Sequence, residues 1–331
     1  GTTASTPEGV RNAVKEIGYP VLIRPSYVLG GRGMEILSND RQLAAYMEEA
    51  FLSPDRPLLV DEYLGNATEL DVDAVCDGSE VLIGAIMEHL EEAGIHSGDS
   101  TCFIPPQNVS KKILAQVEDW TRKIGLELGV LGYLNIQYAI RGETLYVLEV
   151  NPRGSRTFPF VAKATGVPLA RIAARLTLGE KLADLDFPEP QTEAVCVKAP
   201  VFPFIKLRGL DPAPGPEMKS TGEVMGSHKR AAAAYLKARL ATELPVPTEG
   251  GVYITVKNAD KHDVIPLAQE LEEMGFTIYA TRGTAHVLRD SGGVNVQTCY
   301  RITEGLTPDA LDLMRQGKIH LIINTPRSTG G

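Results

Sequence analysis

Residues 145–156 read LYVLEVNPRGSR, an apolar segment that ends in a carboxylate, an amide and two arginines. A strand that is buried on both faces shows a continuous apolar run in sequence, so the charge of Glu149 inside this run requires a partner. Glu149 and Asn151 are two residues apart, and on a strand both side chains therefore leave the same face. Two oxygen ligands on one face suit a hard cation such as Mg²⁺ or Mn²⁺, which completes its shell with phosphate oxygens.

The segment before this strand predicts its partner. YLNIQYAI and TLYVLEV, separated by Arg-Gly-Glu, have the pattern of a β-hairpin. Gln137 in the first segment is in position to supply a third oxygen, and Arg153 and Arg156 add positive charge where an anion bridging the cation would lie. The alternative is a structural ion pair between Glu149 and one of these arginines. The hairpin and the segments described next favour the cation site.

The composition is that of an ordinary globular protein, and 331 residues indicate two or three domains. The net charge of −9 argues against a surface for nucleic acid or an anionic membrane, and no apolar run reaches membrane-spanning length. The four cysteines form no CxxC pair, so neither a disulfide framework nor a zinc site is indicated, and we expect the reduced thiols of a cytoplasmic protein. The sequence starts without Met and stops after an apolar strand, so we expect a fragment at both ends.

The N-terminal segment predicts a helix, a strand and a glycine-rich loop. A capped helical pattern covers 6–18, and the strand 19–24 enters the loop 25–37, which contains Gly-Gly-Arg-Gly and leads into another strand. Neither a Walker A nor a Rossmann motif applies, because both need a helix after the loop. The loop is either a flap over phosphates, with Arg24 and Arg32 as counter-charges, or a plain hairpin turn.

Further candidate residues follow in this region. The strand 57–63 ends at Glu62, whose carboxylate either hydrogen-bonds to an adenine or ribose or is a solvated strand end. Residues 69–75, ELDVDAV, alternate acidic with apolar side chains, which predicts a strand with one solvent-exposed face. His96 lies between glycines in a polar loop, where it either contacts a nucleotide or makes a loop hydrogen bond.

The second half of the chain predicts an arm and a separate α/β unit. Residues 188–216 are rich in proline and predict an irregular arm packed on the first domain, and 244–251 is a linker. From 252 onward strands alternate with helices, which predicts a parallel sheet with covered faces. The other predicted helices and strands lie at 40–50, 79–88, 110–128, 159–178, within 226–240, and at 252–256, 262–274, 276–281, 284–290, 294–298 and 319–324.

A second candidate site lies in this α/β unit. Thr281 and Thr284 flank a strand-to-helix turn, where hydroxyls and a helix N-terminus bind an anion. If the strands are adjacent, four more side chains lie near this candidate anion site. The alternative role of each candidate residue is a helix cap or a surface charge. These four are Lys261, Arg301, Asn324 and Thr325.

The assembled motifs resemble those of a known family over nearly the full chain. IRPSYVLGGRGMEI, ELDVDAV, GIHSGDS, NIQYA, LEVNPRGSRTFPFVAKATGVPLA and GPEMKSTGEVMG resemble the C-terminal half of the large subunit of carbamoyl-phosphate synthetase. The resemblance implies an α/β fold class, with an α+β ATP-grasp domain followed by a smaller parallel-sheet methylglyoxal-synthase-like allosteric domain. The expected domains are 1–187, an ATP-grasp domain that lacks its upstream subdomain; 188–243, a proline-rich arm and helix packed on it; and 244–331, an incomplete allosteric domain.

The resemblance also implies a reaction, cofactors and partners. The RPSYVLGG loop and the following regulatory domain select the half that converts carbamate and ATP to carbamoyl phosphate and ADP, a ligase step in arginine or pyrimidine biosynthesis. The implied cofactors are ATP, two Mg²⁺ or Mn²⁺ ions, and K⁺ as a further candidate. The implied partners are the N-terminal half of the same subunit, a glutaminase small subunit and a nucleotide or other small-molecule effector, with an oligomer through the allosteric domain.

Site residues follow from the resemblance position by position. Gln137, Glu149 and Asn151 match metal ligands, in agreement with the strand geometry, and the first two also contact the nucleotide; Arg153 and Arg156 match catalytic arginines near the transferred phosphate. Other nucleotide-binding positions match Arg24, Glu62, Leu64, Glu69, Gly94, Ile95, His96 and Ser97. Effector positions match Lys261, Thr281, Thr284, Asn324 and Thr325, and Arg301 stands where some members have lysine.

Three other functions are compatible with parts of the sequence. A biotin-carboxylase-like ATP-grasp ligase shares the Gly-Gly-Arg-Gly-Met loop, but its Gln-Val-Glu-His motif is absent after Asn151. A catalytically silent effector-binding fragment fits the expected truncation, which also leads us to expect that the isolated chain is inactive and binds nucleotide weakly. A methylglyoxal-forming lyase is the third.

Overall fold

The structure is a computed structural model that describes residues 1–26, 33–50, 57–203, 214–242 and 246–325. The chain divides into two compact units, Gly1–Leu244 and Pro245–Gly331. Within the described residues, the first unit contains two antiparallel sheets and the second contains one parallel sheet. None of the described helices is both long enough and apolar enough to cross a membrane.

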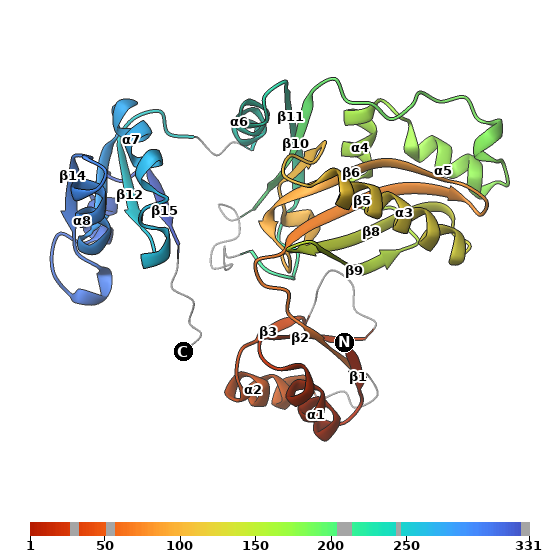
Figure 1. The fold of residues 1–331 in the computed structure, drawn as a ribbon, viewed down its shortest axis with the longest axis horizontal. Coiled ribbons are helices and arrows are strands. Elements are labelled where there is room, and N and C mark those ends of the chain that lie inside the picture. Colours follow the sequence, from red (N-terminus) through yellow and green to blue (C-terminus); the bar gives the residue numbers. More distant parts are fainter. Residues whose placement is uncertain (27–32, 51–56, 204–213, 243–245, 326–331) are drawn as a thin grey trace. The chain divides into compact units, whose positions relative to one another are not determined.

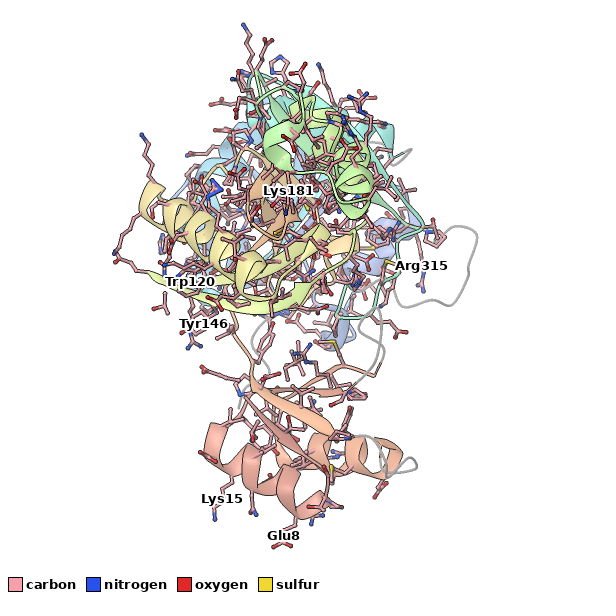
Figure 2. The ribbon with its side chains drawn as sticks, turned by 90° about the vertical axis from the view of Figure 1, so that its right-hand side faces the viewer. Glu8, Lys15, Trp120, Tyr146, Lys181 and Arg315 are labelled. Atoms are coloured by element: carbon pink, nitrogen blue, oxygen red, sulfur yellow. The ribbon has the colours of Figure 1, made fainter. Side chains whose placement is uncertain are left out.

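The N-terminal part of the first unit is a four-stranded sheet in the order β1-β4-β2-β3, with two helices on one face (Figure 1). The predicted first helix is confirmed: the Thr6 side chain accepts from the Gly9 N–H at its start, and Gly18 ends it with φ of +83°. Glu8 and Lys15 of this helix point away from the sheet (Figure 2). The elements are β1 (Thr2–Ala4), α1 (Pro7–Ile17), β2 (Val21–Pro25), β3 (Glu35–Leu37), α2 (Asp40–Ala50) and β4 (Leu58–Glu62).

The glycine-rich loop connects β2 to β3, which pair antiparallel as the predicted hairpin requires. Residues 27–32, including Arg32 and most of the proposed flap, lie outside the described residues. The contact of this loop with phosphates therefore stays a prediction.

The larger part of the first unit is a seven-stranded antiparallel sheet in the order β11-β10-β7-β6-β5-β8-β9 (Figure 1). The predicted hairpin is confirmed as β8 and β9, which pair along their length. The strands are β5 (Thr68–Asp77), β6 (Val81–Glu92), β7 (Cys102–Ile104), β8 (Leu131–Arg141), β9 (Thr144–Asn151), β10 (Val195–Val201) and β11 (Gly222–His228). The helices are α3 (Lys111–Glu127), α4 (Phe158–Thr165), α5 (Leu169–Thr177) and α6 (Ala231–Ala241).

Helices cover both faces of this sheet. One core forms between α3, with Trp120 partly buried in it (Figure 2), and the apolar side chains of β5 and β8. A second core on the opposite face forms between α4, α5 and residues such as Val75 and Met87. Along β5, Glu69, Asp71 and Asp73 share the face of Val75, and their exposed fractions are 3%, 0% and 0%.

The predicted solvent-exposed face of residues 69–75 is therefore wrong. Alternation shows that the two faces of a strand differ, but it does not show that the polar face is open to water. Here β6 and β8 flank β5 on both sides, and the loop after β9 covers the acidic face, because Ser155 and Thr157 both donate to Asp73.

Three other predictions need correction. Residues 188–216 are not irregular throughout, because β-branched Val195, Val197 and Val201 favour strand β10, and its ladder to β7 ends at Lys198, before Pro200. The predicted single helix 159–178 is two helices, separated at Gly166 by left-handed backbone. The segment 145–150 is not buried on both faces, because Val147 and Glu149 are 41% and 43% exposed.

The second unit is a parallel sheet in the order β14-β13-β12-β15, as predicted. Helices α7 and α8 pack on one face, and α9, which the sequence analysis does not predict, packs on the other. The elements are β12 (Gly251–Thr255), α7 (Ile265–Glu273), β13 (Thr277–Thr281), α8 (Arg282–Asp290), β14 (Val296–Cys299), α9 (Ala310–Arg315) and β15 (Leu321–Asn324).

Candidate functional site

Two rows of polar side chains cross three adjacent strands of the large sheet. In the first row, Asp71 of β5 lies opposite Gln137 of β8, which lies opposite Glu149 of β9. In the second row, Asp73 lies opposite Asn135, which lies opposite Asn151. Directly opposed residues of neighbouring strands point to the same face, so these side chains form one polar surface.

The predicted cation ligands lie together on this surface, and their donor atoms fit a hard cation. The Gln137 Nε2 donates to Ser97 Oγ at 3.1 Å, and the Asn151 Nδ2 donates to Asn135 Oδ1 at 3.3 Å. Each amide therefore keeps its oxygen for another ligand. With the carboxylate of Glu149, they make an all-oxygen donor set of the kind Mg²⁺ prefers.

Glu149 does not form the ion pair that the alternative interpretation expects. Its carboxylate lies 4.0 Å from the guanidinium of Arg24, and the side chain is 43% exposed. Arg153 donates to the carbonyl of Gly154 at 3.3 Å, and Arg156 contacts the sulfur of Met218 and both side chain and carbonyl of Ser220. Two positive side chains thus follow the strand without neutralising its carboxylate.

Arg24 joins the small sheet to this surface. Besides Glu149, its guanidinium lies 3.7 Å from Asp61, and its buried Nε has no hydrogen-bond partner among the described residues. Glu62, in contrast, forms an ion pair at 2.8 Å with Arg141, whose guanidinium stacks over the ring of Tyr146. Leu64 packs in a small apolar cluster with Ala67, Ala93 and Ala139.

Glu69 is buried, with 3% of its surface exposed. Burial raises the pKa of its carboxyl, helped by the charge of Asp71, while the N–H of Gly94 donates to the carboxylate and opposes the shift. The His89 Nδ1 lies 3.7 Å away. Burial, with the charges of Lys198 and His96, lowers the pKa of His89 to about 3, so its imidazole is neutral at neutral pH.

The loop that carries Ile95, His96 and Ser97 makes hydrogen bonds both within itself and to other segments, such as that from the His96 N–H to the Gly215 carbonyl at 2.9 Å. The N–H of Ile95 donates to the Glu92 carbonyl at 3.4 Å, and the Nδ1 of His96 accepts from the Gly98 N–H at 3.0 Å. For His96 this is the loop hydrogen bond of the alternative interpretation. Burial lowers the pKa of His96, which keeps the imidazole neutral.

The two motifs GIHSGDS and GPEMKST meet at this loop. The carboxylate of Asp99 accepts from the N–H groups of Lys219 and Ser220, each at 2.8 Å. Lys198 is 0% exposed, and its Nζ donates to the carbonyl of Ser97 at 3.0 Å. A buried ammonium therefore lies on the same side of the sheet as the buried acids of β5, whose pKa values it lowers against the effect of burial.

Sequence patterns alone do not identify Asp71, Asp73, Asn135 or Lys198 as members of the site. Two signals could have found them. Lys198 interrupts an apolar strand, VCVKAPV, and Asn135 precedes Gln137 by two residues on the same strand face.

The residues predicted to bind an effector lie at one edge of the parallel sheet of the second unit. An ideal Cβ placed on Gly283 would come within 2.8 Å of Lys261 Nζ, so this ammonium lies against the first turn of α8. Thr281 is the last residue of β13, and its hydroxyl oxygen lies 3.5 Å from the hydroxyl oxygen of Thr255. Thr284 is 1% exposed, and its Oγ1 has no hydrogen-bond partner among the described residues.

Three further predicted residues belong to the same edge. Asn324 ends β15 opposite Thr255, and the hydroxyl of Thr325 accepts from the N–H of Lys257 at 2.9 Å. Arg301 is exposed just after β14. Because all four strands are parallel, their carboxyl ends share one edge, where α/β sheets bind ligands.

Comparison with known proteins decides the family. Residues 1–185 match the family model of the carbamoyl-phosphate synthase L chain, ATP binding domain. The chain belongs to this family. Residues 263–330 match the model of the MGS-like domain. The resemblance and fold class inferred from the sequence motifs are therefore confirmed.

Curated members of the carbamoyl-phosphate synthase family match almost the whole chain. It is 52% identical over 98% of its length to the carbamoyl phosphate synthase large chain of Methanoculleus marisnigri. It is 50% identical, also over 98%, to the carbamoyl phosphate synthase large chain, C-terminal section, of Methanocaldococcus jannaschii. The chain spans 31% of the first relative and 54% of the second.

Solved structures share the fold at low sequence identity. The N5-carboxyaminoimidazole synthase of Aspergillus clavatus, in complex with ADP and 5-aminoimidazole ribonucleotide, superimposes with a TM-score of 0.57 over 73% of this chain and 68% of that chain, at 15% identity. The biotin carboxylase domain of Hydrogenobacter thermophilus 2-oxoglutarate carboxylase, in complex with MgADP and bicarbonate, superimposes with a TM-score of 0.50. The match covers 59% of this chain and 44% of that chain, at 22% identity. These likenesses show the fold alone.

Proposed function

We propose that this chain is the part of a carbamoyl-phosphate synthase large chain that phosphorylates carbamate with ATP, giving carbamoyl phosphate and ADP. The family match and the near-complete coverage by large-chain relatives support the reaction. The observation that carries the proposal is the pairing of Gln137 with Glu149 next to Asn151, on a face that Arg24 also reaches. A cytoplasmic location and a role in arginine or pyrimidine biosynthesis belong to the same proposal.

The residues of this surface support phosphoryl transfer by positioning and charge. Gln137, Glu149 and Asn151 would hold two divalent ions, Mg²⁺ or Mn²⁺, which neutralise charge on the phosphoryl oxygens. Arg24 reaches the same face and binds nucleotide phosphate, and Arg153 and Arg156 hold the transferred group in line with the attacking carbamate oxygen. No covalent bond to the protein is needed, so the chain's own contribution is orientation and electrostatic stabilisation.

A monovalent cation completes the proposed cofactors. Glu69 is a buried carboxylate whose nearest basic neighbour, His89, is neutral at neutral pH. A buried carboxylate without a cationic partner is costly when ionised. K⁺ beside Glu69 would offset that cost.

The test is the Glu149→Gln substitution in the full-length gene product, assayed for ATP synthesis from carbamoyl phosphate and ADP. We expect a loss on the order of 100-fold, because removing such an electrostatic group costs about 3 kcal/mol of transition-state stabilisation. Glu143→Gln is the matched control, since Glu143 lies in the same hairpin, is 90% exposed and contacts only Lys112 among the described residues. Near-normal activity of Glu149→Gln would refute the assignment.

The second unit is proposed as the regulatory domain. The ammonium of Lys261, the first turn of α8 and the hydroxyl of Thr284, which has no partner in the part of the chain that the structure describes, converge where an anionic group would bind. We assign this edge to a phosphate-bearing effector such as a nucleotide. The proposed partners are the N-terminal half of the large chain and a glutaminase small subunit, with oligomer formation through this domain.

A further inference from the structure

Two buried acids lie on the strand next to the one that carries Gln137, a proposed cation ligand. Asp71 and Asp73 are both 0% exposed on β5, the strand next to β8. The Asn135 Nδ2 donates to Asp71 Oδ1 at 2.5 Å and to Asp73 Oδ1 at 2.9 Å. Asp73 is fixed as an acceptor because the hydroxyls of Ser155 and Thr157 both donate to it, and of the two ends of an amide only the nitrogen donates. The nitrogen of Asn135 is therefore fixed towards β5.

The orientation of the Asn135 amide determines the orientation of the Asn151 amide on the next strand. With its nitrogen towards β5, Asn135 presents its oxygen towards β9, where it accepts from Asn151 Nδ2 at 3.3 Å. The Asn151 nitrogen is thus fixed in turn, and its oxygen faces away from Asn135. A flip of either amide would exchange an oxygen for an NH₂ group, and an NH₂ group cannot bind a cation.

We propose that Asp71 and Asp73 are positioning residues, which fix the amide of Asn135 and through it the amide of Asn151, so that an oxygen faces the cation. This inference rests on the proposed function, because it assumes the cation site at Gln137, Glu149 and Asn151. It assigns Asp71 and Asp73 an indirect role, since both are buried on the far side of Asn135.

The two acids differ in what else they contact. Asp73 also accepts from the hydroxyls of Ser155 and Thr157, in the loop that carries Arg153. The side chain of Asp71 makes its one hydrogen bond with Asn135 among the described residues, and its second oxygen has no partner there. A buried acid whose second oxygen has no hydrogen-bond partner is costly to keep for stability alone. Orientation of Asn135 accounts for its presence.

The experiment measures Mn²⁺ binding to this chain by electron paramagnetic resonance, in which free Mn²⁺ gives the signal. The variants are Asp71→Asn and Asp71→Asn/Asp73→Asn. An asparagine presents either an oxygen or a nitrogen, so the double variant no longer fixes Asn135. We expect a 10- to 100-fold weaker Mn²⁺ affinity for the double variant and a smaller loss for the single one, as for other residues that orient metal ligands.

Two controls separate orientation from general damage. Asp77→Asn is matched, because Asp77 lies on the same strand and is buried, but its carboxylate accepts from Ser79 and Leu182 at the other end; we expect unchanged Mn²⁺ affinity. In an Asn151→Asp background, a carboxylate offers oxygen in either orientation. There the Asp71→Asn/Asp73→Asn pair should change Mn²⁺ affinity less than twofold.

The outcomes distinguish the inference from the proposed function. If Glu149→Gln weakens Mn²⁺ binding but Asp71→Asn/Asp73→Asn does not, the positioning role is wrong and the cation site stands. An equal loss with and without Asn151→Asp also overturns the inference, because it shows a general structural effect. A wild-type chain that binds no Mn²⁺, or a Glu149→Gln variant that binds it normally, contradicts the cation site itself.

Discussion

Replacing Lys198 by methionine tests how the acidic face of the large sheet is held together. Lys198 is 0% exposed, and methionine has a similar length without the charge. Burial raises the pKa of Asp71 to about 8 and that of Asp73 to about 6, and the charge of Lys198 opposes both shifts. Removing one member of a buried charge network costs about 3–5 kcal/mol, because its partners stay buried without compensation.

The loss of stability should depend on pH in a defined direction. The folded pKa values of both acids lie above the value of about 4 that an aspartate has in an unfolded chain, so the folded state keeps protons that the unfolded state releases. Their contribution to stability is therefore fully present below about pH 4 and is lost as pH rises towards 8. Without Lys198 the folded pKa values rise further. We expect the full 3–5 kcal/mol loss at pH 8 and a clearly smaller loss at pH 5.

The assay is urea unfolding at pH 5 and pH 8, followed by fluorescence. Trp120 is the one tryptophan of the chain and lies in α3 against the sheet, so its emission reports on this unit. Lys112→Met is the control, because Lys112 is 78% exposed and pairs only with exposed Glu143 among the described residues; its free energy of unfolding should stay within about 0.5 kcal/mol of wild type. An equal loss at both pH values, or a larger loss at pH 5, would show that Lys198 does not compensate these carboxyl groups.

Two further substitutions probe other contacts. Tyr138→Phe should lower the free energy of unfolding by about 1–3 kcal/mol, because the buried Thr121 hydroxyl, which lies 2.9 Å from the tyrosine oxygen, loses its partner. In the same urea assay, the double variant Tyr138→Phe/Thr121→Val should recover part of this loss. No recovery would contradict the pairing. Thr284→Val breaks no hydrogen bond among the described residues, so we expect unchanged stability but about 5- to 10-fold weaker binding of inorganic phosphate by calorimetry, the worth of one hydrogen bond. Thr277→Val, at the exposed start of β13, is its control, and equal affinities of the two variants would remove Thr284 from the effector site.

Sequence patterns predict this fold where the signal is local. The caps of α1, the β8–β9 hairpin and the alternation of the second unit depend on residues close together in the chain, and all three are confirmed. The hairpin brings Gln137 near Glu149, but the register set by the turn alone would place Gln137 opposite Leu148, and an irregularity between Gln137 and Tyr138 shifts its partner to Glu149. These inferences need no knowledge of distant strands.

The acidic face shows why the remainder could not be predicted. Whether Asp71 faces water or protein depends on β6 and β8 and on the loop that holds Ser155, which come from other parts of the chain. The position of β9 at the sheet edge is equally non-local, since it follows from the absence of a further paired strand beyond it among the described residues. Burial of Lys198, which lies on β10, depends on the neighbouring strand β7 and on the loop of Ser97, which is 101 residues earlier in the sequence.

The order of the strands explains why amides and one carboxylate, rather than the two aspartates, are in position to bind a cation. Asp71 and Asp73 are the stronger ligands by charge, yet they lie on a central strand with no exposed surface. Glu149 lies on the edge strand and is 43% exposed, and its one ion pair in the described part of the chain is the 4.0 Å contact with Arg24. In the proposed site, a phosphate with its cation would interact with both Arg24 and Glu149, so little would be lost when that contact opens. In the proposed site, ligand exchange would take place at the edge strand and the buried strand would fix the orientation of the amides, and the two cross-strand rows connect these strands.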